Sequence, residues 1–210
     1  MQLIGKLEIK SKEKITEFLN SEATGRIAST DANGFPQIIP MNFVFVNDVI
    51  YMHSHTKGEK LDNIRKNNKV GFEVDRNLEF LPSYFFHPTD ASVADTLYIS
   101  VVIKGHAYIV DDNEEKTLAL NELMDKYQPE GKYQPISPEM DVLNGVAVIK
   151  VVTNSLHGKY KIGQNMKNAE KIALGENIFE RNSKTAKETL EIMGFSVSDS
   201  GIKLEKNVEW

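Results

Sequence analysis

Strand-like patterns of apolar and polar residues dominate the middle of the chain. Alternating positions and short β-branched runs predict six strands. They span residues 25–30, 37–46, 49–55, 69–75, 97–110 and 145–153. The turns 31–34 (DANG) and 47–48 (ND) separate the first three strands, and these residue types favour tight turns. The first three strands therefore predict an antiparallel meander.

Helix-like spacing, with apolar residues three or four apart, occurs outside these strands. The predicted helices span residues 11–20, 57–67, 111–127, 164–174 and 183–193. Residues 76–97 contain Pro82 and Pro88 and predict a long loop. Gly105 interrupts the strand 97–110 and indicates a bulge or a bend there.

The order of these elements predicts a mainly β fold, namely a six-stranded antiparallel split β-barrel with peripheral helices. The βαβ alternation of parallel sheets is missing, and closing a sheet into a barrel removes its exposed edges. We expect the barrel domain to cover residues 1–163. We expect residues 164–210 to form a C-terminal helical extension packed on the barrel.

Composition excludes several classes of protein. The chain has 210 residues, of which 40% are hydrophobic and 26% are charged, as in ordinary folded proteins. It has no cysteine, which excludes disulfides, iron–sulfur ligation and a thiol nucleophile. The net charge of −5 disfavours nucleic acid as a partner. The sequence shows no membrane-spanning run and no signal-peptide pattern at MQLIGKLEIK, so we expect a cytoplasmic protein without a membrane partner.

The most informative stretch for chemistry is residues 51–61 (YMHSHTKGEKL), where a strand ends and a helix begins. The first N–H groups of a helix are unpaired and carry partial positive charge. Lys57 and Lys60 add full charges, and Ser54 and Thr56 add hydroxyl donors, so a phosphate would find partners here. A solvated helix start with ordinary surface lysines explains the same pattern.

His53 and His55 lie two residues apart on one strand and therefore face the same side. No carboxylate or third histidine stands at a recognisable metal spacing, and the nearby lysines would repel a cation, so we expect no metal. A neutral imidazole that donates to a ligand oxygen or stacks on a ring fits better. The alternative is a half-buried polar residue in a barrel wall.

Pro40 lies in the middle of the predicted second strand. Proline cannot donate to a sheet, so it predicts a local break in the pairing. Backbone groups freed beside it could address the polar edge of a planar ring. A bend of the barrel explains Pro40 equally well.

The order and spacing of several segments resemble the pyridoxamine 5′-phosphate oxidase-like FMN-binding split barrels. The nearest branch contains the 5-nitroimidazole-resistance proteins. The early segments that carry the resemblance are GRIAST, the DANG turn, PQIIPMNFVFV and VIYMHSHTKGEKLDNIRKNNKVGFEV. The later ones are YISVVIKGHAYIVDDNEEKTLALNELMDKYQPEG, VAVIKVV and HGKYKIGQN. Together they cover about residues 20–168.

The resemblance implies FMN bound between the two subunits of a homodimer. The residues that it places at the flavin ring are Ile39, Pro40, Met41, Asn42, His53 and Ser54. His53 matches the active-site histidine of the nitroimidazole branch and is the candidate catalytic residue. The candidate phosphate ligands are Lys57, Gly58 and Lys60.

The resemblance also places two further groups near the cofactor. Ser100 and Val101 match the strand through which the partner chain reaches the flavin, and Lys161 and Gln164 match a C-terminal motif that closes near it. Dimerisation has a physical motive as well, because Val101 and Ile103 are expected to face outwards from the barrel and to need cover.

The resemblance implies an FMN-dependent oxidoreductase. It would pass electrons from a reduced nicotinamide or similar donor to a small electron-poor acceptor such as a nitroaromatic, with His53 positioning the acceptor or giving it a proton. Two alternatives are a non-catalytic flavin-binding or sensing protein, and a split barrel that binds another planar ligand such as haem. Residues 57–60 (KGEK) stand where pyridoxamine phosphate oxidases have Ser-Arg-Lys, and their Arg-rich C-terminal strand is missing, which counts against vitamin B6 oxidation.

Overall fold

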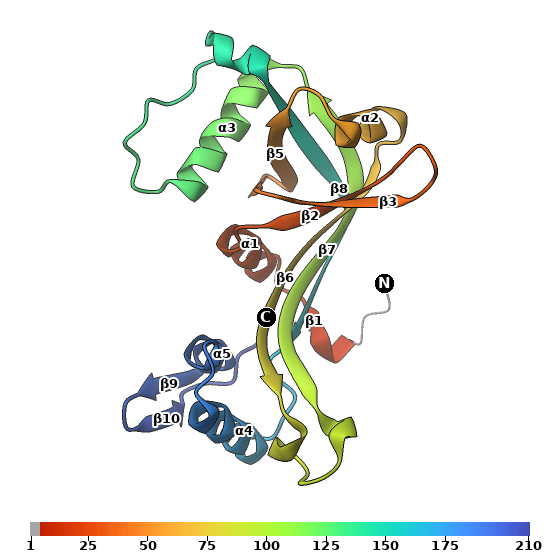
Figure 1. The fold of residues 1–210 in the computed structure, drawn as a ribbon. Coiled ribbons are helices and arrows are strands. Elements are labelled where there is room, and N and C mark those ends of the chain that lie inside the picture. Colours follow the sequence, from red (N-terminus) through yellow and green to blue (C-terminus); the bar gives the residue numbers. More distant parts are fainter. Residues whose placement is uncertain (1–4) are drawn as a thin grey trace. The chain divides into compact units, whose positions relative to one another are not determined.

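A mainly antiparallel sheet forms the framework of the computed structural model, which describes residues 5–210 (Figure 1). Seven strands follow one another in the order β3-β2-β6-β7-β8-β5-β4, β1 pairs with β8, and β9 and β10 form a separate hairpin. The strands are β1 (Glu8–Ile9), β2 (Gly25–Thr30), β3 (Pro36–Met41), β4 (Val44–Val46), β5 (Val49–His55), β6 (Lys69–Leu81), β7 (Asp95–Val110), β8 (Val146–Lys161), β9 (Phe195–Ser198) and β10 (Gly201–Leu204).

Short helices connect and flank these strands. The α-helices are α1 (Lys12–Ser21), α2 (Glu59–Lys66), α3 (Asn113–Tyr127), α4 (Asn168–Arg181) and α5 (Ala186–Met193). The 3₁₀ helices are η1 (Gly5–Leu7), η2 (Ser83–Phe85), η3 (Ala91–Val93) and η4 (Asp141–Gly145). The predicted fold class, a mainly β split barrel with peripheral helices, is confirmed. None of the helices in residues 5–210 combines the length and apolar character that crossing a membrane requires.

The described chain divides into two compact units. The barrel unit consists of residues 12–74 and 101–157, and the helical unit consists of residues 5–11, 75–100 and 158–210. The long strands β6, β7 and β8 each have residues in both units. The predicted division at residue 163 stays a prediction.

Alternation along the strands builds the core of the barrel unit. On β7, the side chains of Val101 and Ile103 are fully buried, whereas Val102 is half-buried and Lys104 is exposed. The expectation that Val101 and Ile103 face outwards is therefore wrong, because they occupy the inward positions of the period-2 pattern. Gly105 continues the inward row, and a Cβ there would stand 2.4 Å from the carbonyl oxygen of Val152.

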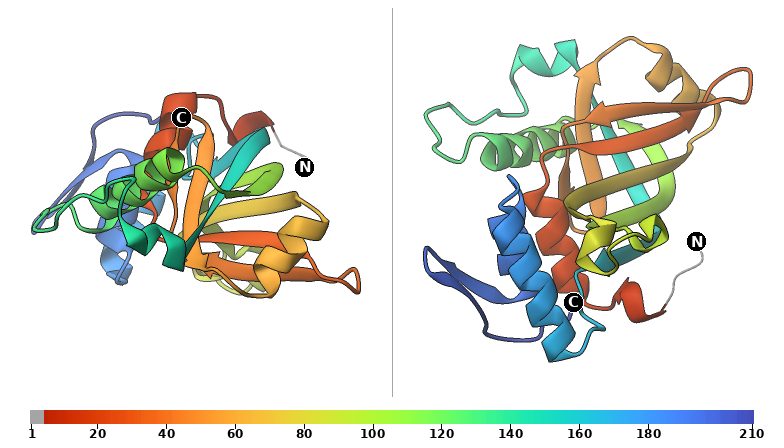
Figure 2. Two further views of the ribbon diagram at one scale, coloured as in Figure 1. Left: turned by 90° about the horizontal axis from the view of Figure 1, so that it is seen from above. Right: turned by 60° about the horizontal axis from the view of Figure 1, so that its bottom comes forward.

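Helix α3 lies beside β5, as Figure 2 shows, and its buried side chains pack on the barrel core. The buried residues of this cluster are Val44, Tyr51, Val110, Ala119, Leu120, Leu123, Leu143 and Val148. A polar link holds the two elements together at the edge of the cluster. The Tyr51 hydroxyl donates to Glu115 at 2.9 Å, and Lys150 Nζ pairs with the same carboxylate at 2.7 Å. Burial and the hydrogen bond to Glu115 raise the pKa of Tyr51 to about 12.

A buried carboxylate organises the helical unit. The side chain of Glu79 on β6 is almost inaccessible and accepts three hydrogen bonds from the end of α4 and the turn into α5. The donors are Arg181 Nη1 at 2.9 Å, Ser183 Oγ at 2.5 Å and Thr185 Oγ1 at 2.7 Å. Because each donor satisfies part of the charge, Glu79 fixes the α4–α5 turn to the end of β6.

Lys171 in α4 is a buried basic residue that lacks partners in the described part of the chain, in contrast to Glu79. Its side chain is fully buried, and its Nζ has no hydrogen-bond partner among the described residues. Burial without a compensating partner disfavours the charged form, so it lowers the pKa of Lys171. The fold tolerates this group at a cost in stability.

The main sheet has eight strands where the pattern predicts six. The predicted strand 37–46 is two strands, β3 and β4, which pair with β2 and β5 respectively. The two-residue strand β1 is too short to leave a pattern. Pro40 does not break the pairing. It lies on β3, the end strand of the sheet, opposite Arg26 of β2, and an end strand tolerates a missing backbone N–H. The chain leaves β3 after Met41.

Residues 76–97 contain more regular structure than the predicted loop. β6 continues to Leu81, where Pro82 ends it, and β7 begins at Asp95. Helix α4 extends to Arg181, beyond the predicted end at residue 174. The hairpin β9–β10 is missing from the prediction because two strands of four residues give too little alternation to recognise.

Candidate functional site

The structure brings together β3 and the first turn of α2 in the barrel unit. The ammonium of Lys60 lies 3.3 Å from the sulfur of Met41, and both side chains are half-buried. Two segments predicted to face the same cofactor, residues 39–42 and 57–60, thus meet through a direct side-chain contact. Thioether sulfur is a weak acceptor, so the cation keeps donor capacity for a ligand.

Lys60 is a cation without a neutralising acid. Among residues 5–210 its side chain has no ion pair, and Met41 is its hydrogen-bond partner. Burial lowers the pKa of Lys60, because water solvates the half-buried ammonium poorly. An anion placed beside the ammonium would offset this cost, whereas a ligand cation would raise it.

A polar bridge fixes the start of α2 against β3. The amide nitrogen of Gln37 donates to Glu59 at 2.5 Å, and its amide oxygen accepts from Asn63 at 3.2 Å. Asn63 is almost fully buried, so this bond satisfies a group that would otherwise be costly. The sequence pattern does not single out Gln37 and Asn63. The two residues are 26 positions apart, and nothing in the sequence indicates that their side chains are in contact.

The N-terminus of α2 is open. Gly58 has φ of 146°, no side chain caps the helix, and a Cβ on Gly58 would have no neighbour within 4 Å. The helix therefore begins with N–H groups that no capping side chain uses, beside open space and next to Lys60. Lys57 is exposed on the same turn. This arrangement fits the predicted phosphate site.

The end of β5 has a free edge beside this helix start. β8 pairs with β5 along Val49–His55, whereas β4 pairs only with its first three residues. The side chain of His53 is exposed, and within the described residues its imidazole makes no hydrogen bond. Ser54 is half-buried and its hydroxyl donates to the carbonyl of His55 at 3.0 Å. His53 is thus available to a ligand.

His55 has a local structural role. Its Nδ1 accepts the backbone N–H of Lys57 at 3.2 Å and so holds the turn between β5 and α2. The ring shares its exposed face with His53, as predicted. The residues that the structure describes contain no group of three side chains suited to a metal ion.

The four candidates on and after β3 divide between its two faces. Ile39 and Met41 share the half-buried face with Gln37, and Ile39 lies opposite Ile27 in the register with β2. Pro40 and Asn42 are exposed. Ile39 and Met41 therefore line the side of β3 that meets α2, whereas the ring of Pro40 lies on the other face.

The remaining candidates have other surroundings. Val101 is fully buried in the barrel, so its side chain is not available to a ligand outside, and Ser100 beside it is half-buried. In the helical unit, Lys161 pairs with both carboxylate oxygens of Asp95 at 2.5 Å. The amide of Gln164 donates to the carbonyl of Tyr160 at 3.0 Å and accepts from the N–H of Ile162 at 2.9 Å. Lys161 and Gln164 therefore already have partners within their own unit.

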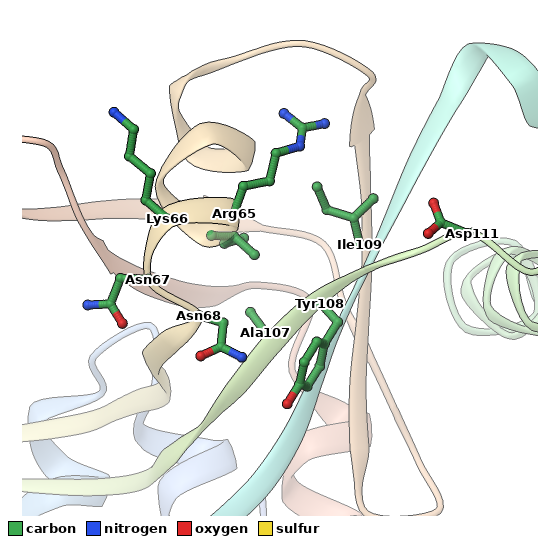
Figure 3. Close-up of a pocket in the computed structure, with 9 residues that line it drawn as sticks. Arg65, Lys66, Asn67, Asn68, Ala107, Tyr108, Ile109 and Asp111 are labelled. Carbon is green, nitrogen blue, oxygen red and sulfur yellow. The ribbon is translucent and has the colours of Figure 1, made fainter.

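A hollow of about 510 Å³ lies at the opposite end of α2 (Figure 3). It is lined by Ile64, Arg65, Lys66, Asn67, Asn68, Ala107, Tyr108, Ile109 and Asp111. Figure 3 shows Arg65 and Lys66 pointing one way and Tyr108 the other. Arg65 is also paired with Asp62 at 2.9 Å. Since the polar groups do not converge, we assign no ligand to this hollow.

Comparison with solved structures supports the fold. A protein from Bacteroides thetaiotaomicron assigned to 5-nitroimidazole antibiotic resistance is 25% identical, with a TM-score of 0.61 over 73% of this chain and 86% of that one. A flavocytochrome from Azotobacter vinelandii is 16% identical, with a TM-score of 0.64 over 77% of this chain and 72% of that one. An FAD- and haem-binding protein from Mycobacterium smegmatis is 16% identical, with a TM-score of 0.64 over 80% of both chains.

Comparison with family models and with curated proteins gives two further results. No curated protein matches the chain. The family model described as pyridoxamine 5′-phosphate oxidase matches residues 11–160. This match covers most of the chain and includes β3, β5 and α2, and it confirms the resemblance derived from the sequence. The protein belongs to the pyridoxamine 5′-phosphate oxidase family.

Proposed function

We propose that the protein binds FMN and acts as an oxidoreductase towards small electron-poor acceptors. The observation that carries the proposal is the half-buried ammonium of Lys60, which has no neutralising acid and stands at the uncapped start of α2. A phosphate there would meet a full charge and helix N–H donors together. A flavin with a phosphate tail suits this site better than a neutral ring.

The ring of the flavin would lie along β3 and the free edge of β5. Ile39 and Met41 offer apolar contact on one side, and His53 and Ser54 lie at the strand end. The names of two structural relatives, a flavocytochrome and an FAD- and haem-binding protein, support a flavin as the ligand to test on this fold. FMN is the choice here because the residues of the site address a single phosphate.

When bound, the flavin would supply the electron transfer itself. The chain supplies the rest. Lys60 and the start of α2 hold the phosphate and so position the ring. Because the His53 imidazole is exposed and has no protein partner in residues 5–210, it is free to donate a hydrogen bond to an acceptor and to give it a proton.

A homodimer would complete the site. Strand β3 is an end strand of the sheet, and Phe35 and Ile38 on the β2–β3 hairpin are 69% and 62% exposed. Large apolar side chains at an open sheet edge favour cover by another chain. We propose that a second copy covers this edge, encloses the flavin ring and excludes water from it. Sedimentation of the flavin-loaded protein tests this, and a monomer would contradict it.

Turnover is the test of the proposed activity. FMN-loaded protein is mixed with NADH or NADPH and a nitroimidazole under anaerobic conditions, and nucleotide oxidation is followed by absorbance. We expect oxidation that depends on the acceptor. We also expect His53→Gln to lower the rate while leaving FMN affinity unchanged, since His53 acts on the acceptor. Tight FMN binding without turnover for any donor would refute the oxidoreductase and favour the non-catalytic flavin-binding alternative.

A further inference from the structure

A second hollow of the barrel unit lies on the outer face of the sheet, across β6, β7 and β8. It has a volume of about 430 Å³ and is lined mostly by carbon. The lining residues are Lys69, Val70, Gly71, Lys104, Gly105, His106 and Asn154. None of them belongs to the site proposed for FMN.

Gly71 creates the space. It lies on the outward row of β6, opposite Ala28 on β2, and a Cβ there would have only Ala28 Cβ within 4 Å, at 3.8 Å. The two smallest residue types therefore stand side by side where larger side chains would fill the surface. Glycine weakens a strand, and close approach of a ligand to the backbone is one of the reasons for its presence in one.

Two cations without anionic partners border this space. Lys69 and Lys104 are exposed, and within residues 5–210 neither ammonium has an ion pair or a hydrogen bond. The acidic residue further along the same face of β6, Glu73, already pairs with Arg26 at 3.1 Å. Positive charge is thus concentrated here in a chain whose net charge is −5.

The third polar group is oriented by a neighbour. His106 Nδ1 lies 2.7 Å from Asn154 Oδ1. Because an amide oxygen only accepts, Nδ1 carries the proton, and in the neutral imidazole the opposite nitrogen, Nε2, is left as an acceptor for a donor group of a ligand. Asn154 thereby fixes the direction of the imidazole at the edge of the hollow.

We propose that this hollow binds a small phosphorylated molecule with an apolar body. Lys69 and Lys104 would hold the phosphate, since two ammonium groups match a dianion better than a monoanionic carboxylate. The apolar body would lie over Gly71 and the carbon-lined wall. The proposal is independent of FMN binding, because it uses no residue of the FMN site.

Calorimetric titration at constant ionic strength tests the proposal, with phenyl phosphate, inorganic phosphate and benzoate as the probes. We expect one phenyl phosphate per chain whose binding does not depend on Lys60, and we expect this binding to be tighter than that of either of the other two probes. Lys104→Met is expected to weaken it about tenfold to a hundredfold, the usual range for one charge-assisted hydrogen bond. Lys184→Met removes an exposed lysine elsewhere and serves as the matched control.

The variant Gly71→Val tests the contribution of the hollow separately from that of the charges on Lys69 and Lys104. Valine favours strands and has room at this position, so the variant is expected to fold and to keep both lysines, yet to lose phenyl phosphate. Lys60→Met is expected to bind phenyl phosphate as the wild type does. Binding that survives Gly71→Val but disappears in Lys60→Met would overturn the proposal, because the probe would then occupy the FMN site. Failure of the wild type to bind either phosphate would also overturn it, and equal affinity for both would overturn the apolar part of the ligand assignment.

Discussion

Replacing Lys60 by methionine separates the ligand role of this residue from its role in the fold. The ammonium is half-buried, and its partner in the described structure is the sulfur of Met41. Burial lowers the pKa of Lys60, because the half-buried ammonium is poorly solvated in the ligand-free protein. Methionine keeps most of the aliphatic stem and removes the charge. We therefore expect the ligand-free variant to be at least as stable as the wild type.

The effect on FMN is expected to have the opposite sign. A hydrogen bond from an ammonium to a phosphate contributes about 1.5–3 kcal/mol. At about 1.4 kcal/mol per factor of ten, Lys60→Met should raise the Kd for FMN about 10-fold to 150-fold. Riboflavin lacks the phosphate, so its Kd should change little.

Quenching of flavin fluorescence measures both dissociation constants, and urea unfolding measures stability. Lys66→Met, an exposed lysine at the other end of α2, is the control and should leave both ligands unaffected. Equal weakening of FMN and riboflavin by Lys60→Met would refute the assignment of the phosphate to Lys60. So would loss of FMN binding together with a fall in the free energy of unfolding, because that would indicate a structural role.

Three further predictions concern stability, each measured by urea unfolding. Glu79→Gln should lower the free energy of unfolding by about 2–4 kcal/mol, because three donors lose a buried charged acceptor, whereas the exposed Glu180→Gln should have little effect. Lys171→Met should raise it by about 1–3 kcal/mol by removing a buried amine without a partner, and no gain would contradict its burial. Burial lowers the pKa of Lys126 from 10.5 to about 8, so the unfolded chain binds more protons between these values. The free energy of unfolding should therefore rise with pH across that window, and the slope should be smaller in Lys126→Met.

The sequence pattern predicted the positions of the barrel strands because these strands combine alternating positions with short β-branched runs. β7 alternates between buried and less buried residues from Leu97 to Tyr108, so its inward row is continuous there, whereas β5 contains three consecutive buried residues, Ile50, Tyr51 and Met52. The same pattern does not show which of the two rows of β7 faces inwards, and the expectation that Val101 faces outwards is therefore wrong. A shift by one residue exchanges the two faces of a strand, and only the packed neighbours decide between them.

The sequence predicted only part of the candidate site, because the rest of the site depends on contacts between distant residues. The helix start near Gly58 and the shared face of His53 and His55 follow from local residue types. The contact of Lys60 with Met41 and the bridge from Gln37 to α2 depend on how β3 and α2 meet, which spacing does not encode. The outer hollow is a further example, because Gly71 and Lys104 become neighbours only when β6 and β7 pair.

The most direct test of the account is whether FMN stays with the protein. The purified protein is incubated with FMN, passed through gel filtration, and its visible absorbance spectrum is recorded across the protein peak. The account predicts flavin bands that elute with the protein at one FMN per chain, and fewer of them in Lys60→Met. A colourless protein peak, with all FMN in the small-molecule fractions and no binding in equilibrium dialysis, would contradict it.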